Sequence, residues 1–275
     1  MNARTVNAGL RFRFGEAPVL WRVNAERLML LGWSRAILLQ LAHPLVAAGV
    51  AEHSTFRGGP LTAVARLHHT VRAMLALTFG DASAQQRSLD TIRAIHRRVH
   101  GRLPHAVGRF AAGTPYSAED PALLLWVHAT LVDSVLLVYD RVVSPLSTAE
   151  RDVYCAEASG VAVALGARDQ EVPRTQEALH QYVSATLGSG AIAVGGQARE
   201  LAEAVLAPPL GFVTWPAARV NQLVTAGLLP AAVREQYGFR WDANARRTLE
   251  AILRLIRGTR RALPRSIAWW PDARG

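Results

Sequence analysis

Histidine is the residue type whose placement in this sequence most suggests chemistry. The chain contains nine histidines, and six lie in segments with helical patterning: His43, His53, His68, His69, His96 and His128. A neutral imidazole binds metal ions through a ring nitrogen and exchanges protons near neutral pH. A single histidine on an apolar face is more often a hydrogen-bonded core residue, so each assignment depends on the surrounding residues.

Ile92, His96 and Val99 share one face of a predicted helix, because their spacing follows the three- and four-residue helical repeat. An imidazole that projects from an apolar wall suits the proximal ligand of a heme, since one nitrogen binds iron and apolar surface holds the macrocycle. His100 lies one turn later, so His96 with His100 or His128 could instead chelate a lone metal ion. Spacing alone leaves both possibilities open.

Arg66, His69 and Thr70 fall within one helical turn. A guanidinium, an imidazole and a hydroxyl on a shared face offer fixed donors to developing negative charge, as in a pocket for dioxygen or a heme propionate. The same pattern also fits a solvated polar face.

Glycine and proline divide the chain into helical segments without sustained strand alternation, which predicts an all-α fold with a single domain over residues 1–275. Asp120 before Pro121 predicts a helix start, and Ser147 with Glu150 predicts a capping box. The predicted helices span residues 18–30, 34–53, 60–78, 82–100, 121–143, 148–165, 173–187, 197–206, 216–228 and 242–263.

The most apolar stretch, residues 123–139, is near the lower length limit for a membrane helix. It contains His128 and Asp133, so a buried central helix is the better interpretation. The proline-rich residues 207–211 form the strongest break, which we interpret as a turn within one domain.

The formal charge of +10 would favour nucleic acid or an anionic membrane as a partner. Every basic residue is arginine and these residues look scattered along the chain, so no nucleic-acid partner is expected. Peripheral membrane contact stays possible, and Trp269-Trp270 could cap the domain, touch a membrane or mediate a dimer. The N-terminus lacks the apolar core of a secretion signal, which predicts a cytoplasmic protein.

Several enzyme classes lack their signature motifs here. The sequence contains no H-E-x-x-H, G-x-S-x-G, phosphate-binding loop or G-x-G-x-x-G. The lone Cys155 excludes a disulfide or a cysteine-ligated cluster within one chain, and we expect it to be buried.

Five short motifs, taken in order, resemble a known family: Gln40-Leu41-Ala42-His43-Pro44, His53-Ser54-x-Phe56, Arg66-x-x-x-Thr70, His96-x-x-Val99-x-Gly101 and Trp126-Val127-His128-Ala129-Thr130-Leu131. Their order and spacing are similar to the catalytic domain shared by bacterial rubber oxygenases, or latex-clearing proteins, and the fungal oxygenase of mycophenolic acid biosynthesis. The resemblance covers about residues 30–210 and identifies the chain as a bacterial member of unknown substrate.

The resemblance implies a globin-like helical core that binds heme b, with His96 as the proximal iron ligand. It implies that Arg66 and Thr70 belong to the distal pocket. Rubber oxygenases carry a lysine just before this threonine, whereas this chain has His69, which could ligate iron or hydrogen-bond dioxygen. Glu52 is the nearest acid that could match the family's catalytic glutamate, although the residues around it depart from the family pattern.

The predicted function is therefore a heme b-dependent oxygenase that uses dioxygen on an apolar substrate, such as an isoprenoid or another lipid. One alternative is a heme or lipid carrier without turnover, and another is a mononuclear metal enzyme with histidine ligands. A helical domain that binds no cofactor is a further alternative. For His43 and His128 we expect structural hydrogen bonding rather than ligation.

Overall fold

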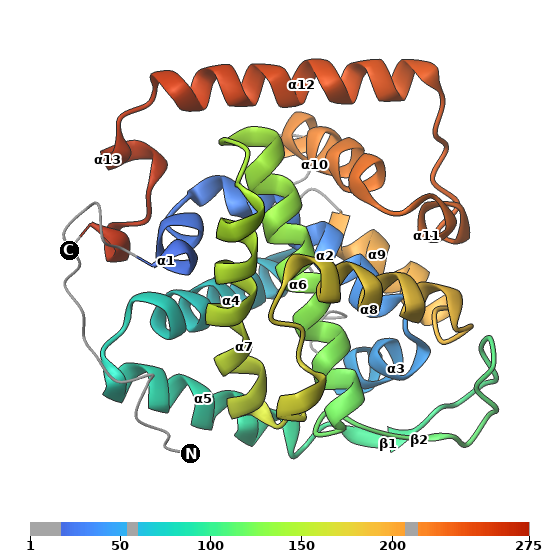
Figure 1. The fold of residues 1–275 in the computed structure, drawn as a ribbon. Helices are drawn as coiled ribbons and strands as arrows, with labels where there is room; N and C mark the ends of the chain where they lie inside the picture. Colours follow the sequence, from blue (N-terminus) through green and yellow to red (C-terminus); the bar gives the residue numbers. More distant parts are fainter. Residues whose placement is uncertain (1–17, 54–59, 207–213, 275) are drawn as a thin grey trace.

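The computed structural model describes residues 18–53, 60–206 and 214–274, except for the side chains of residues 60–67 and 215. These residues form thirteen α-helices, short 3-10 helices and one small antiparallel sheet, which confirms the all-α class (Figure 1). The elements are α1 (Val19–Asn24), η1 (Arg27–Gly32), α2 (Trp33–Leu41), α3 (Pro44–His53), α4 (Pro60–Phe79), α5 (Ala82–His96), β1 (His100–Arg102), β2 (Pro115–Ser117), α6 (Pro121–Val142), α7 (Thr148–Leu165), η3 (Asp169–Glu171), α8 (Gln176–Gly188), α9 (Gly196–Leu206), α10 (Trp215–Leu228), α11 (Ala231–Gln236), α12 (Ala243–Ala262), α13 (Arg265–Ala268) and η5 (Pro271–Ala273).

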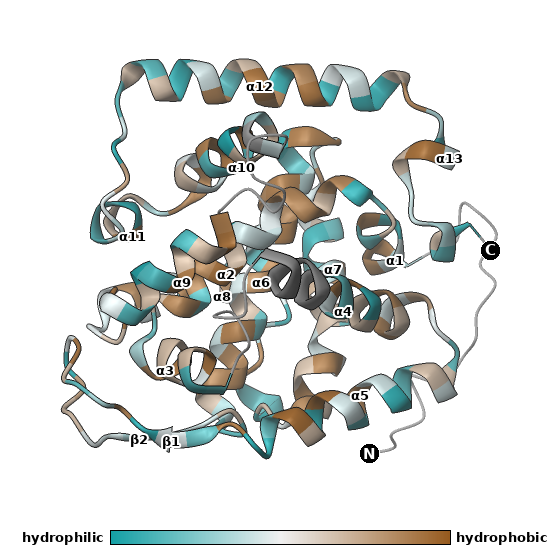
Figure 2. Cartoon of the chain, turned by 180° about the vertical axis from the view of Figure 1, so that it is seen from behind, coloured by the Kyte–Doolittle hydropathy of each residue, from teal (hydrophilic) through white to brown (hydrophobic). Residues whose placement is uncertain are grey.

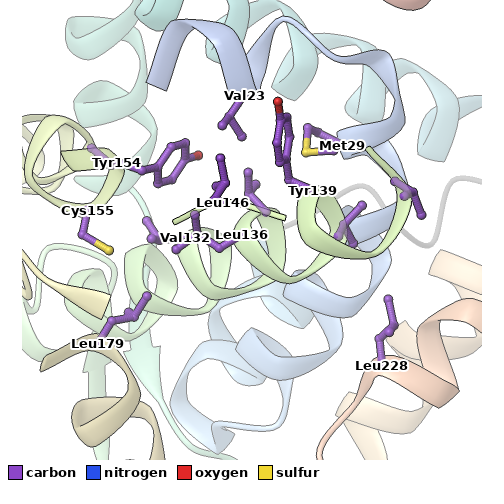
Figure 3. Packing of buried hydrophobic residues seen from close by; sticks show 14 of the residues in the cluster. Val23, Met29, Val132, Leu136, Tyr139, Leu146, Tyr154, Cys155, Leu179 and Leu228 are labelled. Atoms are coloured by element: carbon purple, nitrogen blue, oxygen red, sulfur yellow. The ribbon is translucent and has the colours of Figure 1, made fainter. Parts of the chain in front are cut away.

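Helix α6 is the central helix, and α2, η1, α7, α8 and α12 pack around it. The Asp120 carboxylate caps it by accepting from the Ala122 amide at 2.8 Å, as the sequence predicts. Its side chains Leu136 and Tyr139 meet Met29 in the largest apolar cluster (Figure 3). Although α6 is long and apolar enough to cross a membrane, 67% of its most apolar window is buried inside the fold. The interpretation as a core helix fits this burial.

The single helix expected over residues 34–53 is wrong, because α2 and α3 are separate helices and the chain bends by 106° between the segment Arg27–Leu41 and α3. His43 precedes the first residue of α3, and its Nδ1 accepts from the Leu45 amide at 3.3 Å. Pro44 has no amide hydrogen and suits the first position of the new helix. The carbonyl of Ala42, at the end of α2, accepts instead from the Ala193 amide at 2.9 Å.

The helix expected over residues 18–30 also differs, because α1 ends at Asn24 and a 3-10 helix follows. Glu26 between them is extended and bridges to Trp269 near the C-terminus. Its carboxylate accepts from the Trp269 indole at 2.8 Å and from Arg260 at 2.5 and 2.7 Å. Trp269 is 5% exposed, so the tryptophan tail caps this side of the fold.

The remaining predicted helices mostly match. Helix α7 has the predicted bounds, and its capping box joins Ser147 and Glu150. Cys155 lies buried on this helix, as expected. Helix α11 was not predicted, and the expected turn at residues 207–211 lies outside the described residues.

Candidate functional site

Helices α4 and α5 form an antiparallel hairpin that carries most of the predicted site residues. Asp81 caps α5 by accepting from the Ala84 amide at 2.7 Å, and Ser88 Oγ donates to the Ala73 carbonyl at 3.3 Å. Because the two helices run in opposite directions, His96 at the end of α5 and Arg66 near the start of α4 both lie at the open end of the hairpin. The fold therefore places the predicted proximal and distal residues at the same end of one hairpin.

His96 ends α5 on the inward face, as predicted, with Ile92 half-buried on the preceding turn. Arg93 fixes this end of α5, because its guanidinium donates to the Ala164 carbonyl of α7 at 3.0 Å. The pKa of His96 is lowered, because burial disfavours the charged imidazolium; the negative charge of the Glu119 carboxylate opposes this shift but is the smaller effect. The imidazole is therefore neutral at ordinary pH, which is the form that binds a metal.

The Nδ1 atom of His96 is fully buried and has no hydrogen-bond partner within the described part of the chain. A buried polar atom without a hydrogen-bond partner lowers the stability of the fold by about 1–3 kcal/mol, so such atoms are uncommon in native proteins and often lie at functional sites. A heme ligand needs a neutral imidazole in an apolar wall with one ring nitrogen free to bind the iron, whereas the other ring nitrogen is usually hydrogen-bonded. His96 fits that requirement.

The distal candidates lie on α4 with exposed side chains where the structure describes them. His69 and Thr70 are both exposed, and the His69 ring lies 6.0 Å from the ring of His68. The backbone of Arg66 belongs to the same helix, one turn before Thr70, while its side chain lies outside the described atoms. The three residues stand on one stretch of helix, as the sequence predicts, and their contact with a ligand stays a prediction.

Glu52, the candidate catalytic acid, lies in the last turn of α3. Its carboxylate accepts from the Tyr116 hydroxyl on β2 at 2.5 Å. Burial and the Glu52 carboxylate together raise the pKa of Tyr116, so the hydroxyl keeps its proton. Gly101 faces this pair, and a Cβ there would come within 2.6 Å of the Tyr116 oxygen. Sequence reasoning missed Tyr116, which holds Glu52 in place.

The helix expected to run to His100 is wrong, because α5 ends at His96 and His100 begins strand β1. His100 is exposed and pairs with Ser117 across the hairpin, so it does not share a helix face with His96. Among the described residues, no group of three His, Cys, Asp or Glu side chains could hold a metal ion. A heme does not require such a group of protein ligands, because its macrocycle supplies four nitrogen ligands to the iron and the protein adds one histidine.

His128 lies in the middle of α6, and burial lowers its pKa to about 4. No hydrogen bond to its ring is found within the described residues, so the expected structural hydrogen bond is not seen. His43 does make the expected structural bond, as the cap of α3.

A cavity of about 370 Å³ opens beside His43, with mainly apolar walls from α6 and α8. Trp126 and Tyr182 line it, and Arg109 lies at its edge with a hydrogen bond to the Ser189 carbonyl at 3.2 Å. No residue of α4 or α5 is among its described lining residues. The sequence motifs contain His43 and Trp126 but gave no sign of Arg109, which comes from the loop between the two strands.

The described residues thus include a half-buried imidazole at His96 and a carboxylate, Glu52, held by a hydrogen bond, within an all-α fold. A family model described as "ER-bound oxygenase mpaB/B'/Rubber oxygenase, catalytic domain" matches residues 21–258. The chain belongs to this family of oxygenase catalytic domains, as its sequence motifs predict.

Two bacterial relatives are similar to this chain over most of its length. Uncharacterized proteins of Mycobacterium bovis and Mycobacterium tuberculosis are each 26% identical over 238 residues, which cover 85% of this chain and 89% of each relative. No solved structure matches the chain. The match extends beyond the predicted 30–210 and includes most of α12.

Proposed function

We propose that this chain is a heme b-dependent oxygenase that uses dioxygen to oxidise an apolar substrate, such as an isoprenoid or another lipid. Membership of an oxygenase family supports the reaction class. The observation that carries the heme assignment is His96, whose Nδ1 is buried without a hydrogen-bond partner among the described residues and whose pKa is lowered by burial. A globin-like arrangement of the core helices belongs to the same proposal.

His96 would hold the heme, and the heme would supply the metal at which dioxygen reacts. The chain's own residues would position the heme and place polar groups around the bound ligand. Arg93 anchors the end of α5 to α7 and so fixes the position of the helix turn that carries His96. Arg66 would offer a cationic donor from α4, whose start lies at the same end of the hairpin as His96.

His69 and Thr70 would complete the distal side in this proposal. Both side chains are exposed on α4, the helix against which the ligand would lie. Glu52 would accept or return a proton during the reaction, with its carboxylate oriented by the Tyr116 hydroxyl.

The proximal assignment is tested by heme loading of His96→Ala and His100→Ala proteins. The His100 variant is the matched control, since it removes an exposed histidine four residues away. Each protein is expressed with a heme precursor, and heme is measured from the Soret band and the pyridine hemochromogen. We expect loss of heme only from the His96 variant. Normal heme content in that variant would show that another residue ligates the iron.

The distal assignment is tested in the same way by comparing His69→Ala with His68→Ala. The two histidines are neighbours on α4 and both are exposed, so the pair differs mainly in direction around the helix. A change of the ferric spin state in the His69 variant alone supports distal ligation. Identical spectra in the two variants would exclude it and leave Arg66 and Thr70 as the distal residues.

Oxygen consumption separates the oxygenase from a carrier. Heme-loaded protein is given unsaturated isoprenoid or fatty-acyl compounds, and dioxygen uptake is followed together with product mass. Uptake that disappears in the Arg66→Gln protein at unchanged heme content supports turnover. Stable heme binding without uptake for any of these compounds would favour the carrier.

A further inference from the structure

Helix α12 lies along one edge of the molecule and buries only one face (Figure 1). Leu249 and Leu253 are buried on that face, and the helix packs there against α6 and α10. The opposite face is covered by no other described element (Figure 2). Apolar and polar residues alternate along α12 in the hydropathy colouring, as expected for an amphipathic surface helix.

This helix concentrates the positive charge of the chain. Between Asp242 and Arg265 there are seven arginines and two acidic residues, a net +5, which is half of the formal charge of +10. The interpretation of the arginines as scattered is therefore wrong for this segment. The seven are Arg246, Arg247, Arg254, Arg257, Arg260, Arg261 and Arg265.

Three of these arginines form a line along the outer face. Arg247, Arg254 and Arg261 are seven residues apart, and each step of seven returns to nearly the same side of a helix, about 20° away. Each step also rises about 10.5 Å, so the line is about 21 Å long. All three side chains are exposed. We refer to Arg247, Arg254 and Arg261 as the arginine line.

The charge of the arginine line is not neutralised by the protein. Within the described residues, none of its three arginines forms an ion pair with a carboxylate. Glu250, the acidic residue within α12, pairs with Arg141 instead. Arg260, on the inner side of α12, is also engaged, because it forms an ion pair with Glu26.

An apolar side chain stands next to this charge. Leu255 is 70% exposed, the most exposed of the large hydrophobic residues in the described chain, and it follows Arg254 directly. Small residues, Ala251, Gly258 and Ala262, flank the line, so no bulky side chain shields it. A lipid surface offers phosphate to the arginines and hydrocarbon to the leucine. The phosphates of a nucleic acid would leave Leu255 in water, and this outer face has no aromatic residue on which an unpaired base could stack.

We propose that the outer face of α12 docks this protein on an anionic phospholipid bilayer, with the helix parallel to the membrane plane. Arginines near an anionic surface each strengthen binding several-fold, so the three together account for a change on the order of a hundredfold. Leu255 inserts at the level of the headgroups. The inference does not depend on heme, since no candidate site residue lies on α12.

The test is co-sedimentation with phosphatidylcholine vesicles and with vesicles in which phosphatidylserine replaces part of the phosphatidylcholine. The key protein carries Arg247→Gln, Arg254→Gln and Arg261→Gln together. The control carries the same change of charge at three exposed arginines elsewhere, Arg87→Gln, Arg168→Gln and Arg174→Gln. Circular dichroism and heme content are compared first, because exposed positions should leave both unchanged.

We expect the wild type and the control to sediment only with the anionic vesicles, and the arginine-line variant to bind on the order of a hundredfold more weakly. A Leu255→Gln protein should also bind more weakly at unchanged charge. Equal weakening in the control would overturn the proposal, since any loss of charge would then suffice. Unchanged vesicle binding in the arginine-line variant, with loss of duplex DNA binding measured by fluorescence anisotropy, would assign the face to nucleic acid instead.

Discussion

Replacing His43 by asparagine should make the free energy of unfolding less sensitive to acid. His43 is 7% exposed, and its Nδ1 caps α3 by accepting from the Leu45 amide. Burial first, and then the positive charge of Arg109, lower the pKa of His43 from 6.5 to about 4, while Asp120 opposes the shift. Asparagine keeps an acceptor at a similar position and does not titrate.

The expected magnitude follows from the difference between the folded and unfolded pKa values. Below pH 6.5 the unfolded chain takes up a proton at this residue, but the folded protein does not until about pH 4. Acid therefore stabilises the unfolded state, and the free energy of unfolding falls as the pH decreases through this window. A pKa lowered from 6.5 to about 4 corresponds to a loss of about 3 kcal/mol.

The measurement is urea unfolding of the wild type and the His43→Asn protein at several pH values from neutral to about 4. The contributions of His128 and of the carboxylates are common to both proteins and cancel in the difference. His180→Asn is the matched control, because it makes the same substitution at an exposed histidine. Parallel curves for wild type and His43→Asn would refute the assignment of a neutral, buried His43.

Three further substitutions test the packing around the central helix. Arg35→Leu should lower the free energy of unfolding by about 3–5 kcal/mol, because it leaves the Asp133 carboxylate without its 2.7 Å partner; a loss under 1 kcal/mol in urea unfolding would contradict this. Asp120→Ala should cost about 1 kcal/mol in the same assay through loss of the α6 cap, and no change would argue against that cap. Glu26→Gln should weaken the ion pair with Arg260, so that amide hydrogen exchange at residues 265–274 becomes faster. Unchanged exchange there would show that the packing of Trp269 alone holds this segment in place.

Helices whose ends are set by nearby residues could be predicted from the sequence. Ser147 and Glu150 cap each other within one turn, and α7 accordingly has the predicted bounds. The same holds for the start of α6 at Asp120. A capping interaction spans only three or four residues, so sequence order alone contains the information.

The helix ends that were predicted incorrectly depend on partners far away in the chain. The first helix stops before Glu26, whose partner Trp269 is 243 residues away. Helix α5 stops at His96 because the following residues pair with β2, with the Gly101 position opposite Tyr116. The face of α5 that holds His96 was predictable from its apolar period, but the loss of His100 from that face was not.

The arginines of α12 show a different limit. The seven-residue spacing of the arginine line is visible in the sequence, so its alignment on a helix could have been predicted. The spacing does not reveal which of these arginines are engaged by other residues of the fold. Arg257 and Arg260 belong to the same helix, yet they turn inward to the Asp140 carbonyl and to Glu26. Only the packing of α12 on α6 and α10 separates the arginines that hold the fold together from those that remain available to an anionic partner.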